Sequence, residues 1–235
     1  GIEVGFSELR LDDPTAVSIL TDILGEVAEL TPGPWLHVGG DEPLVIPGER
    51  YATSVATAEK LVRDVGKKAI GWNESVRGVQ DTRTVIQHWD YRTELAALAN
   101  AARQGHRVIM SPAAHVYLDM KYTADYAHGQ DWAGLIEVAE SYEWDPATNV
   151  PNLDANQILG IEATVWTEKI HTREAMLEML LPRLASIAEI AWSPRLEQDR
   201  ELAQIAPRLA AQAARWERKD WPFYRSPQVD WSAAE

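Results

Sequence analysis

Two adjacent carboxylates follow a short apolar stretch and a pair of glycines in the segment WLHVGGDEP, residues 35–43. Side chains in a strand alternate between two faces, so Asp41 and Glu42 would point apart if the strand continued through them. Gly39 and Gly40 permit backbone conformations that other residues avoid, and such a pair can end a strand in a bend. The segment therefore predicts a bent strand end at which two carboxylates share one ligand.

Polar and aromatic residues also end three other stretches that are typical of strands. These ends are Trp72-Asn73-Glu74, His88-Trp89-Asp90 and Trp166-Thr167-Glu168. In parallel α/β folds ligands bind at the carboxyl ends of the strands, so these groups are expected to meet Asp41 and Glu42 at one mouth. Indole rings stack on the C–H faces of a sugar and carboxylates accept its hydroxyl hydrogens, so the pattern favours a carbohydrate ligand.

The spacing of the two carboxylates favours one kind of glycoside hydrolysis. Such enzymes commonly use a carboxylic acid to protonate the leaving oxygen and a second carboxylate as nucleophile or base, tasks that adjacent residues seldom divide. Adjacent carboxylates do suit a substrate that supplies its own nucleophile, such as a 2-acetamido group whose carbonyl oxygen attacks the anomeric carbon. One carboxylate then orients the acetamido group, while its negative charge raises the pKa of the neighbouring acid and keeps it protonated.

Short apolar strands alternate with amphipathic helices along the chain. Helices are expected at 14–30, 49–65, 93–104, 173–191 and 199–217, and strands at 35–40, 68–72, 84–89, 107–110 and 160–166. Asp13 and Pro14 form a typical helix start. Strands separated by helices indicate parallel βαβ units, so the fold class is α/β, either an open doubly wound sheet or part of a (β/α)8 barrel. A complete barrel usually needs about 250 residues for eight units, so five units predict a partial barrel whose early units are missing.

Composition excludes several classes of partner. Lys and Arg number 22 against 36 Asp and Glu, and a net charge of -14 disfavours nucleic acid and acidic membrane surfaces. The chain has no cysteine and no apolar run of membrane-spanning length. It also has no glycine-rich phosphate loop, which makes a nucleotide enzyme a distant alternative. No cofactor or metal is expected, and the partner is expected to be a neutral sugar. Oligomeric state and compartment, whether secreted or cytoplasmic, stay open.

The motifs resemble those of family-20 glycoside hydrolases, the β-N-acetylhexosaminidases, of bacterial type. WLHVGGDEP is similar to the family's H-x-G-G-D-E signature. The likeness continues through GW at 71–72, QHW at 87–89, YLDMKY at 117–122, SYEWDP at 141–146, VWTE at 165–168 and FYRSPQV at 223–229. Several independent motifs in the family's order make the resemblance specific, and it covers nearly the whole chain.

The resemblance implies a fold and an activity. Members have a (β/α)8 TIM barrel, usually behind an N-terminal α/β domain. Residues 1–235 are therefore expected to form a single partial catalytic barrel domain with the fourth to eighth strands, the earlier strands and any upstream domain being absent. The implied activity is removal of terminal β-linked GlcNAc or GalNAc, for example from chitin fragments, by a retaining, substrate-assisted mechanism through an oxazolinium ion.

The resemblance also implies residue roles. Asp41 orients and polarises the acetamido group, and Glu42 is the general acid and base. The implied sugar-binding residues are Trp72, Trp89 and Trp166 as pocket walls, Tyr117 as donor to the acetamido carbonyl, and Asp119 and Glu168 as partners of the outer hydroxyls.

Other readings of the same residues stay open. A non-catalytic carbohydrate-binding protein that keeps the aromatic cleft is the alternative function. His37 is expected to be a hydrogen-bonded interior residue, and Glu74 and Asp90 a solvated rim. The aromatic residues of the long connection 114–157 are expected to belong to a lid or to anchor the loop; they are Tyr122, Tyr126, Trp132, Tyr142 and Trp144.

Overall fold

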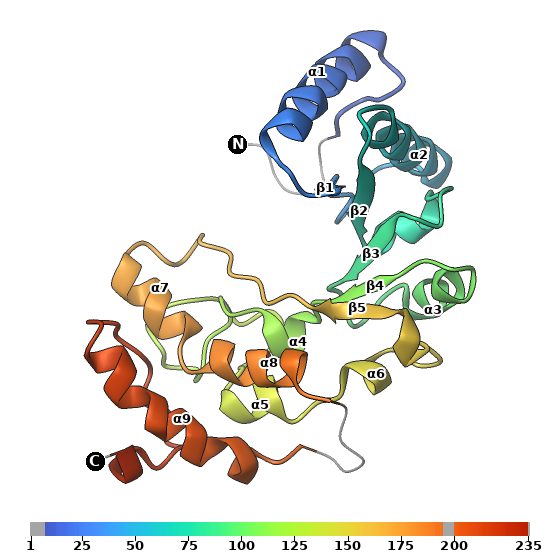
Figure 1. Cartoon of the computed structure of the whole chain (residues 1–235). Coiled ribbons are helices and arrows are strands. Elements are labelled where there is room, and N and C mark those ends of the chain that lie inside the picture. The colour runs from blue at the N-terminus through green and yellow to red at the C-terminus, as the bar shows by residue number, and fades with distance from the viewer. Residues whose placement is uncertain (1–7, 195–199, 235) are drawn as a thin grey trace. The chain divides into compact units, whose positions relative to one another are not determined.

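The computed structural model describes residues 8–194 and 200–234 (Figure 1). The chain divides into two compact units. Within the described residues, the first unit comprises 8–110 and 150–159, and the second comprises 111–149, 160–194 and 200–234.

Five strands form one sheet in the order in which they occur in the chain, β1-β2-β3-β4-β5. They are β1 (Trp35–His37), β2 (Lys68–Trp72), β3 (Val85–His88), β4 (Val108–Met110) and β5 (Ile158–Ile161). The first four pair in parallel, with Leu36 opposite Ala69 and Ile86 opposite Val108. Parallel neighbours that are consecutive in sequence need a crossover between them, and the helices supply it. The predicted succession of βαβ units is therefore confirmed.

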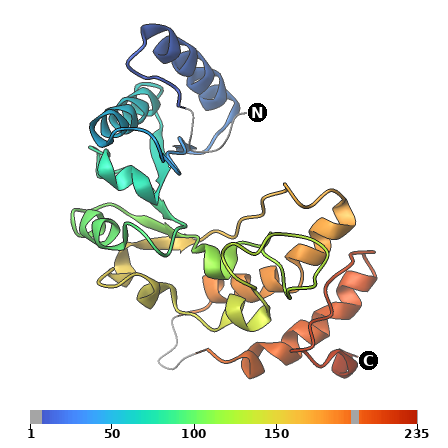
Figure 2. The ribbon, with the colours of Figure 1, turned by 180° about the vertical axis from the view of Figure 1, so that it is seen from behind.

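The helical elements of the first unit are α1 (Pro14–Leu30), α2 (Gly48–Asp64), η1 (Asn73–Arg77), α3 (Leu95–Arg103) and η2 (Ala155–Gln157). Helix α1 begins where predicted, because the Asp13 side chain accepts a hydrogen bond from the Thr15 N–H at 2.8 Å and Pro14 needs no N–H partner in the first turn. Helix α2 runs alongside β2 in both views (Figure 1 and Figure 2).

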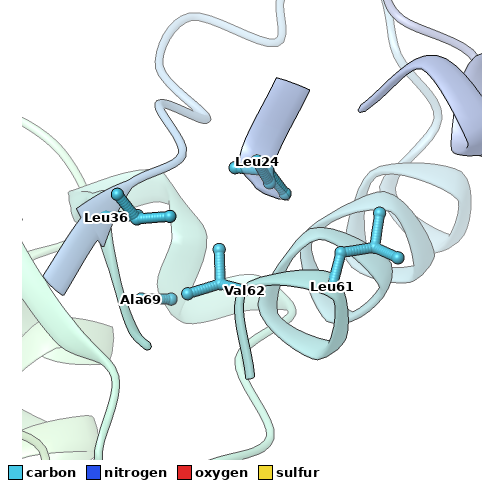
Figure 3. Close-up of a cluster of buried hydrophobic side chains, with 5 residues drawn as sticks. All are labelled: Leu24, Leu36, Leu61, Val62 and Ala69. Carbon is cyan, nitrogen blue, oxygen red and sulfur yellow. The ribbon is translucent and has the colours of Figure 1, made fainter. Parts of the chain in front are cut away.

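One apolar cluster joins these helices to the first two strands. Its side chains come from α1, β1, α2 and β2 (Figure 3); they are Leu24, Leu36, Leu61, Val62 and Ala69. Burying a large aliphatic side chain contributes about 1.5–3 kcal/mol, so the cluster fixes β1 against β2. The residues that follow β1 therefore start from a strand whose position is fixed by packing.

The second unit contains α4 (Ala113–Val116), α5 (Val138–Tyr142), α6 (Pro146–Asn149), α7 (Arg173–Leu180), α8 (Arg183–Trp192), α9 (Leu202–Glu217) and η3 (Trp231–Ala234). The prediction of one helix over 173–191 is wrong, because Pro182 lacks the N–H that a continuous helix needs and separates α7 from α8. The predicted helix at 199–217 is found as α9, and its expected first residue lies outside the described residues.

The last predicted strand, 160–166, is also misplaced. Strand β5 ends at Ile161, because β4 extends only to Met110 before the chain enters α4. Further along, Thr164 forms an isolated parallel bridge with Tyr117. The VWTE segment therefore follows a single bridge rather than a continuous strand.

A buried guanidinium organises the long connection of the second unit. Arg183 donates to the carbonyl oxygens of Leu118, Met120, Ile136 and Met179 at 2.7 to 2.9 Å. Its guanidinium carbon also lies 3.8 Å from the centroid of a tyrosine ring, that of Tyr122. The Tyr122 hydroxyl in turn donates to carbonyls at the end of α7. Of the predicted loop aromatics, Tyr122 is thus an anchor.

Candidate active site

The chain bends sharply after β1, as the two glycines predict. Gly39 and Gly40 have φ angles of 73° and 93°, and Glu42 has a φ of 47°. The left-handed region costs a non-glycine residue free energy and persists only where the surroundings hold it, which is common at functional sites. The N–H of Trp72 donates to the Gly39 carbonyl at 3.0 Å, so the bend is fixed to the end of β2.

A buried tyrosine on α2 holds the same turn from the other side. The Tyr51 hydroxyl donates to the carbonyl oxygen of Gly40 at 2.6 Å. A Cβ atom on Gly40 would lie 3.1 Å from that hydroxyl oxygen. Both the positive φ and this close approach therefore explain glycine at position 40.

A third carboxylate, that of Glu74, is hydrogen-bonded to the backbone of the predicted pair. The N–H of Glu42 donates to Oε1 of Glu74 at 3.0 Å, and the indole Nε1–H of Trp89 donates to Oε2 at 3.1 Å. Asn73 accepts hydrogen bonds from the N–H groups of Trp89 and Asp90, each at 3.0 Å. The ends of β1, β2 and β3 therefore meet, which confirms the predicted convergence for the first unit.

The prediction that Glu74 and Asp90 form a solvated rim is wrong. Glu74 is 5% exposed and Asp90 is 8% exposed. Their carboxylates are buried because they serve as acceptors inside the loops, Glu74 for the Glu42 and Trp89 donors and Asp90 for Arg92 and Thr93.

The local electrostatics favour the protonated form of Glu42. Burial raises the pKa of Glu42, and the negative charges of Asp41, Glu74 and Asp90 raise it further, against the positive charge of Arg92. Burial alone would raise the pKa of Asp90 too, but hydrogen bonds from Arg92 and Thr93 lower it below its ordinary value. Asp90 thus stays ionised beside Glu42, which suits a carboxylic acid that donates a proton.

The aromatic residues of the first unit are set against the turn. Trp72 and Trp89 are buried, and the ring centroid of Trp72 lies 4.9 Å from that of His37. His37 itself is exposed, so the prediction of an interior residue is wrong, because its side chain lies on the face of β1 opposite to Leu36, which packs against α1 and α2. Its Nδ1 accepts the N–H of Gly39 at 3.0 Å, which adds a further restraint to the turn.

The second unit carries an aromatic group built on the bridge between residues 117 and 164. The Tyr117 ring lies 6.3 Å from the Trp166 ring and 5.8 Å, edge-on, from the Trp132 ring, centroid to centroid. Tyr117 is buried, whereas Trp132 and Trp166 are 41% and 42% exposed. Trp132 was predicted only as a lid or anchor residue; its exposed ring beside Tyr117 makes it a further candidate for ligand contact.

Asp119 lies two residues beyond Tyr117 and is 1% exposed. Neither carboxylate oxygen accepts a well-formed hydrogen bond within the described part of the chain. Burial raises the pKa of Asp119 to about 6, against the lowering influence of nearby backbone N–H groups and the Arg183 charge. Such a carboxylate suits sugar hydroxyl donors. Glu168, the other predicted hydroxyl partner, is exposed in the same unit.

Because Trp166 and Glu168 belong to the second unit, their expected meeting with Asp41 and Glu42 stays a prediction. Among the described residues, no three His, Asp or Glu side chains are grouped so as to hold a metal ion. None of the described helices has the length and apolarity to cross a membrane.

Comparison with known proteins identifies the family. The profile of "Glycosyl hydrolase family 20, catalytic domain" matches residues 48–195. A β-N-acetylhexosaminidase of Cellulomonas fimi is 42% identical over 98% of this chain and 46% of its own length. The chain thus spans about half the length of this relative.

Solved structures give the same result. The GH20 β-N-acetylhexosaminidase of Streptomyces coelicolor A3(2) matches 98% of this chain and 47% of its own chain, with 40% identity and a TM-score of 0.93. A mutant Streptomyces plicatus β-hexosaminidase in complex with its product GlcNAc matches with the same coverage, identity and TM-score. These matches confirm the expected fold class, a partial (β/α)8 barrel, and the chain belongs to glycosyl hydrolase family 20.

Proposed function

We propose that this chain supplies the catalytic pair of an exo-acting β-N-acetylhexosaminidase that removes terminal β-linked GlcNAc or GalNAc. We further propose that residues 1–235 form one partial catalytic barrel domain. The observation that carries the proposal is Glu42, held at a φ of 47° directly after Asp41, with three neighbouring carboxylates that raise its pKa. The Cellulomonas relative and the GlcNAc-bound Streptomyces structure support the substrate class.

The proposed reaction has two steps and retains the anomeric configuration. First, the carbonyl oxygen of the 2-acetamido group attacks the anomeric carbon, while Glu42 gives its proton to the leaving oxygen and the glycosidic bond breaks. Asp41 orients the acetamido group and stabilises the positive charge of the oxazolinium ion. Next, Glu42, now a carboxylate, takes a proton from a water molecule whose oxygen attacks the anomeric carbon and reopens the ring.

The aromatic residues and outer carboxylates are proposed to bind the same sugar. Trp72, Trp89 and Trp166 are apolar walls, against which the sugar ring and the acetamido methyl group pack. The Tyr117 hydroxyl donates to the acetamido carbonyl. Asp119 and Glu168 accept hydrogen bonds from outer hydroxyls.

Asp41→Asn is expected to lower kcat/KM for an aryl β-N-acetylglucosaminide by about 100- to 1000-fold, the usual cost of removing one group that stabilises a developing charge. The amide keeps the size of the side chain but loses the charge that stabilises the oxazolinium ion. Steady-state kinetics with the complete gene product measure the effect, with Asp64→Asn on the exposed face of α2 as control. Equal wild-type activity on the matching aryl β-glucoside, which lacks the acetamido group, would contradict this role.

Asp119→Asn is expected to stabilise the fold at neutral pH while weakening sugar binding. The folded pKa of about 6 lies above the ordinary value for aspartate, so the native state binds more protons and the unfolding free energy falls as pH rises from about 4 to about 6. The neutral amide escapes this penalty and should be more stable above pH 6 by about 1–3 kcal/mol, with no difference below pH 4.

Urea unfolding at pH 4 and pH 7.5 and GlcNAc titration test this pair of effects, with the exposed Asp131→Asn as control. A variant that is less stable than wild type at pH 7.5 would contradict the raised pKa of Asp119, and a variant that binds GlcNAc equally well would remove Asp119 from the binding site.

A further inference from the structure

Glu74 holds two parts of the proposed site at once, and the reaction described above assigns it no role. One carboxylate oxygen accepts the backbone N–H of the proposed acid, Glu42, and the other accepts the indole N–H of Trp89. Glu74 is buried at the start of η1. Burying a carboxylate costs free energy unless it is hydrogen-bonded, so its position is explained by the two donors.

One of the two hydrogen bonds acts where the backbone is strained. Glu42 occupies the left-handed region, and its N–H is fixed by Glu74 at 3.0 Å. The backbone carbonyl of Glu42 accepts a hydrogen bond from the N–H of Leu44 at 2.8 Å. Without the Glu74 acceptor the turn could relax toward an ordinary φ, which would redirect the Glu42 side chain.

We propose that Glu74 is a positioning residue, whose buried carboxylate locks the backbone of the general acid Glu42 and the ring of Trp89 into one arrangement. The inference rests on the proposed role of Glu42. Burial raises the pKa of Glu74, while the hydrogen bonds from the Glu42 N–H and the Trp89 indole act in the opposite direction and favour the ionised acceptor. In that form its charge adds to the negative field around the acid. The other groups that affect the titration of Glu42 are Asp41, Asp90 and Arg92, and the Tyr51 hydroxyl and Arg77 lie in the same network.

Glu74→Gln tests this arrangement in the complete gene product. Glutamine keeps the size of the side chain but offers a single acceptor oxygen to two donors, so one buried donor faces an NH₂ group. With a phenyl β-N-acetylglucosaminide, whose leaving group needs protonation, kcat should fall by about 10- to 100-fold. With a dinitrophenyl substrate, whose leaving group departs without a proton, the fall in kcat/KM, which reports the first step alone, should be much smaller.

The pH profile gives a second readout. Removing a negative charge beside Glu42 lowers the pKa of the acid, and the acid must be protonated to react. The alkaline limb of kcat/KM should therefore move to lower pH in Glu74→Gln. A loss of packing alone would leave this limb in place.

Glu59→Gln is the matched control. Glu59 is also a buried glutamate of the first unit and accepts the N–H groups of Gln80 and Asp81 and the hydroxyl of Thr84, before the start of β3. The thermal unfolding midpoint should fall in both variants. Only Glu74→Gln should change the ratio of rates on the two substrates and the alkaline limb.

The outcomes separate this inference from the proposed function. If Glu42→Gln loses phenyl glycoside turnover while Glu74→Gln behaves like Glu59→Gln, the positioning role is wrong and the acid assignment stands. If Glu42→Gln retains that turnover, the proposed function fails, and the inference fails with it. Should Glu74→Gln not fold, Glu74→Asp keeps the charge and is expected to lose rate at an unchanged alkaline limb; a wild-type rate would overturn the role.

A spectroscopic readout is independent of turnover. The indole N–H resonance of Trp89 in a ¹⁵N-labelled protein should lie downfield because it donates to a carboxylate. It should move upfield in Glu74→Gln and stay in place in Glu59→Gln. An unmoved Trp89 resonance would contradict the bridge.

Discussion

Glu42→Gln is expected to lower kcat for a phenyl β-N-acetylglucosaminide by about 10²- to 10⁴-fold, the usual contribution of a general acid. The amide cannot give a proton to the leaving oxygen, although it preserves the shape of the turn. A dinitrophenyl leaving group needs no proton, so the first step should be nearly unaffected with that substrate. Steady-state and burst kinetics on both substrates measure the difference.

The same assignment predicts the direction in which the pH profile of the enzyme is shifted. Burial and the charges of Asp41, Glu74 and Asp90 raise the pKa of Glu42, so its protonated form persists to higher pH than in an ordinary glutamate. The alkaline limb of kcat/KM should therefore lie above the usual glutamate range and should be absent from the residual activity of Glu42→Gln. Glu49→Gln, in the first turn of α2, is the control. Unchanged hydrolysis of the phenyl substrate by Glu42→Gln would show that another group is the acid.

Arg183→Met is expected to lower the free energy of unfolding of the second unit by about 3–5 kcal/mol, because leaving each buried acceptor unpaired costs about 1–3 kcal/mol. Methionine fills much of the volume but leaves the carbonyl oxygens of Leu118, Met120, Ile136 and Met179 without their donor. Tyr117 and Asp119 lie on either side of one of these carbonyls, so GlcNAc affinity should fall with stability.

Denaturant unfolding, followed through tryptophan fluorescence, measures the loss. Arg208→Met removes an exposed ion pair with Glu189 on α8 and should change stability by less than about 1 kcal/mol. Similar losses in the two variants would show that the buried guanidinium does not organise the 114–157 connection.

The sequence predicts the elements best where local signals agree with packing. Strand β2 occupies the predicted residues 68–72 and α1 the predicted residues 14–30, because apolar spacing and the Asp13-Pro14 start both reflect local physics. The break between α7 and α8 could also have been predicted from the sequence, since Pro182 cannot continue a helix. The end of β5 was not, because it depends on where its neighbour β4 stops.

The candidate site divides in the same way. The bend at Gly39 and Gly40 follows from residue type, and the positive φ angles confirm it. The burial of Glu74 depends on donors in the segments that follow β1 and β3, distant in sequence, so the residue could only be predicted as polar and at a strand end. The one available signal was its place directly after Trp72-Asn73, at the start of a helical turn.

The long connection shows a third case. Its tyrosines and tryptophans could be read from the sequence, but anchors and ligand-facing residues look alike there. Tyr122 is held by Arg183 and by backbone carbonyls, whereas Trp132 is exposed beside Tyr117. Tertiary partners decide between the two roles, and the sequence does not identify those partners.

The most direct test of the proposed mechanism is proton NMR of the sugar first released from an aryl β-N-acetylglucosaminide by the complete gene product. A substrate-assisted reaction at Asp41 and Glu42 predicts that β-GlcNAc appears first and then equilibrates with the α anomer. If α-GlcNAc appears first, water attacks the substrate directly. That requires two carboxyl groups about 6.5–9.5 Å apart on opposite faces of the sugar, and it would contradict the roles proposed for this adjacent pair.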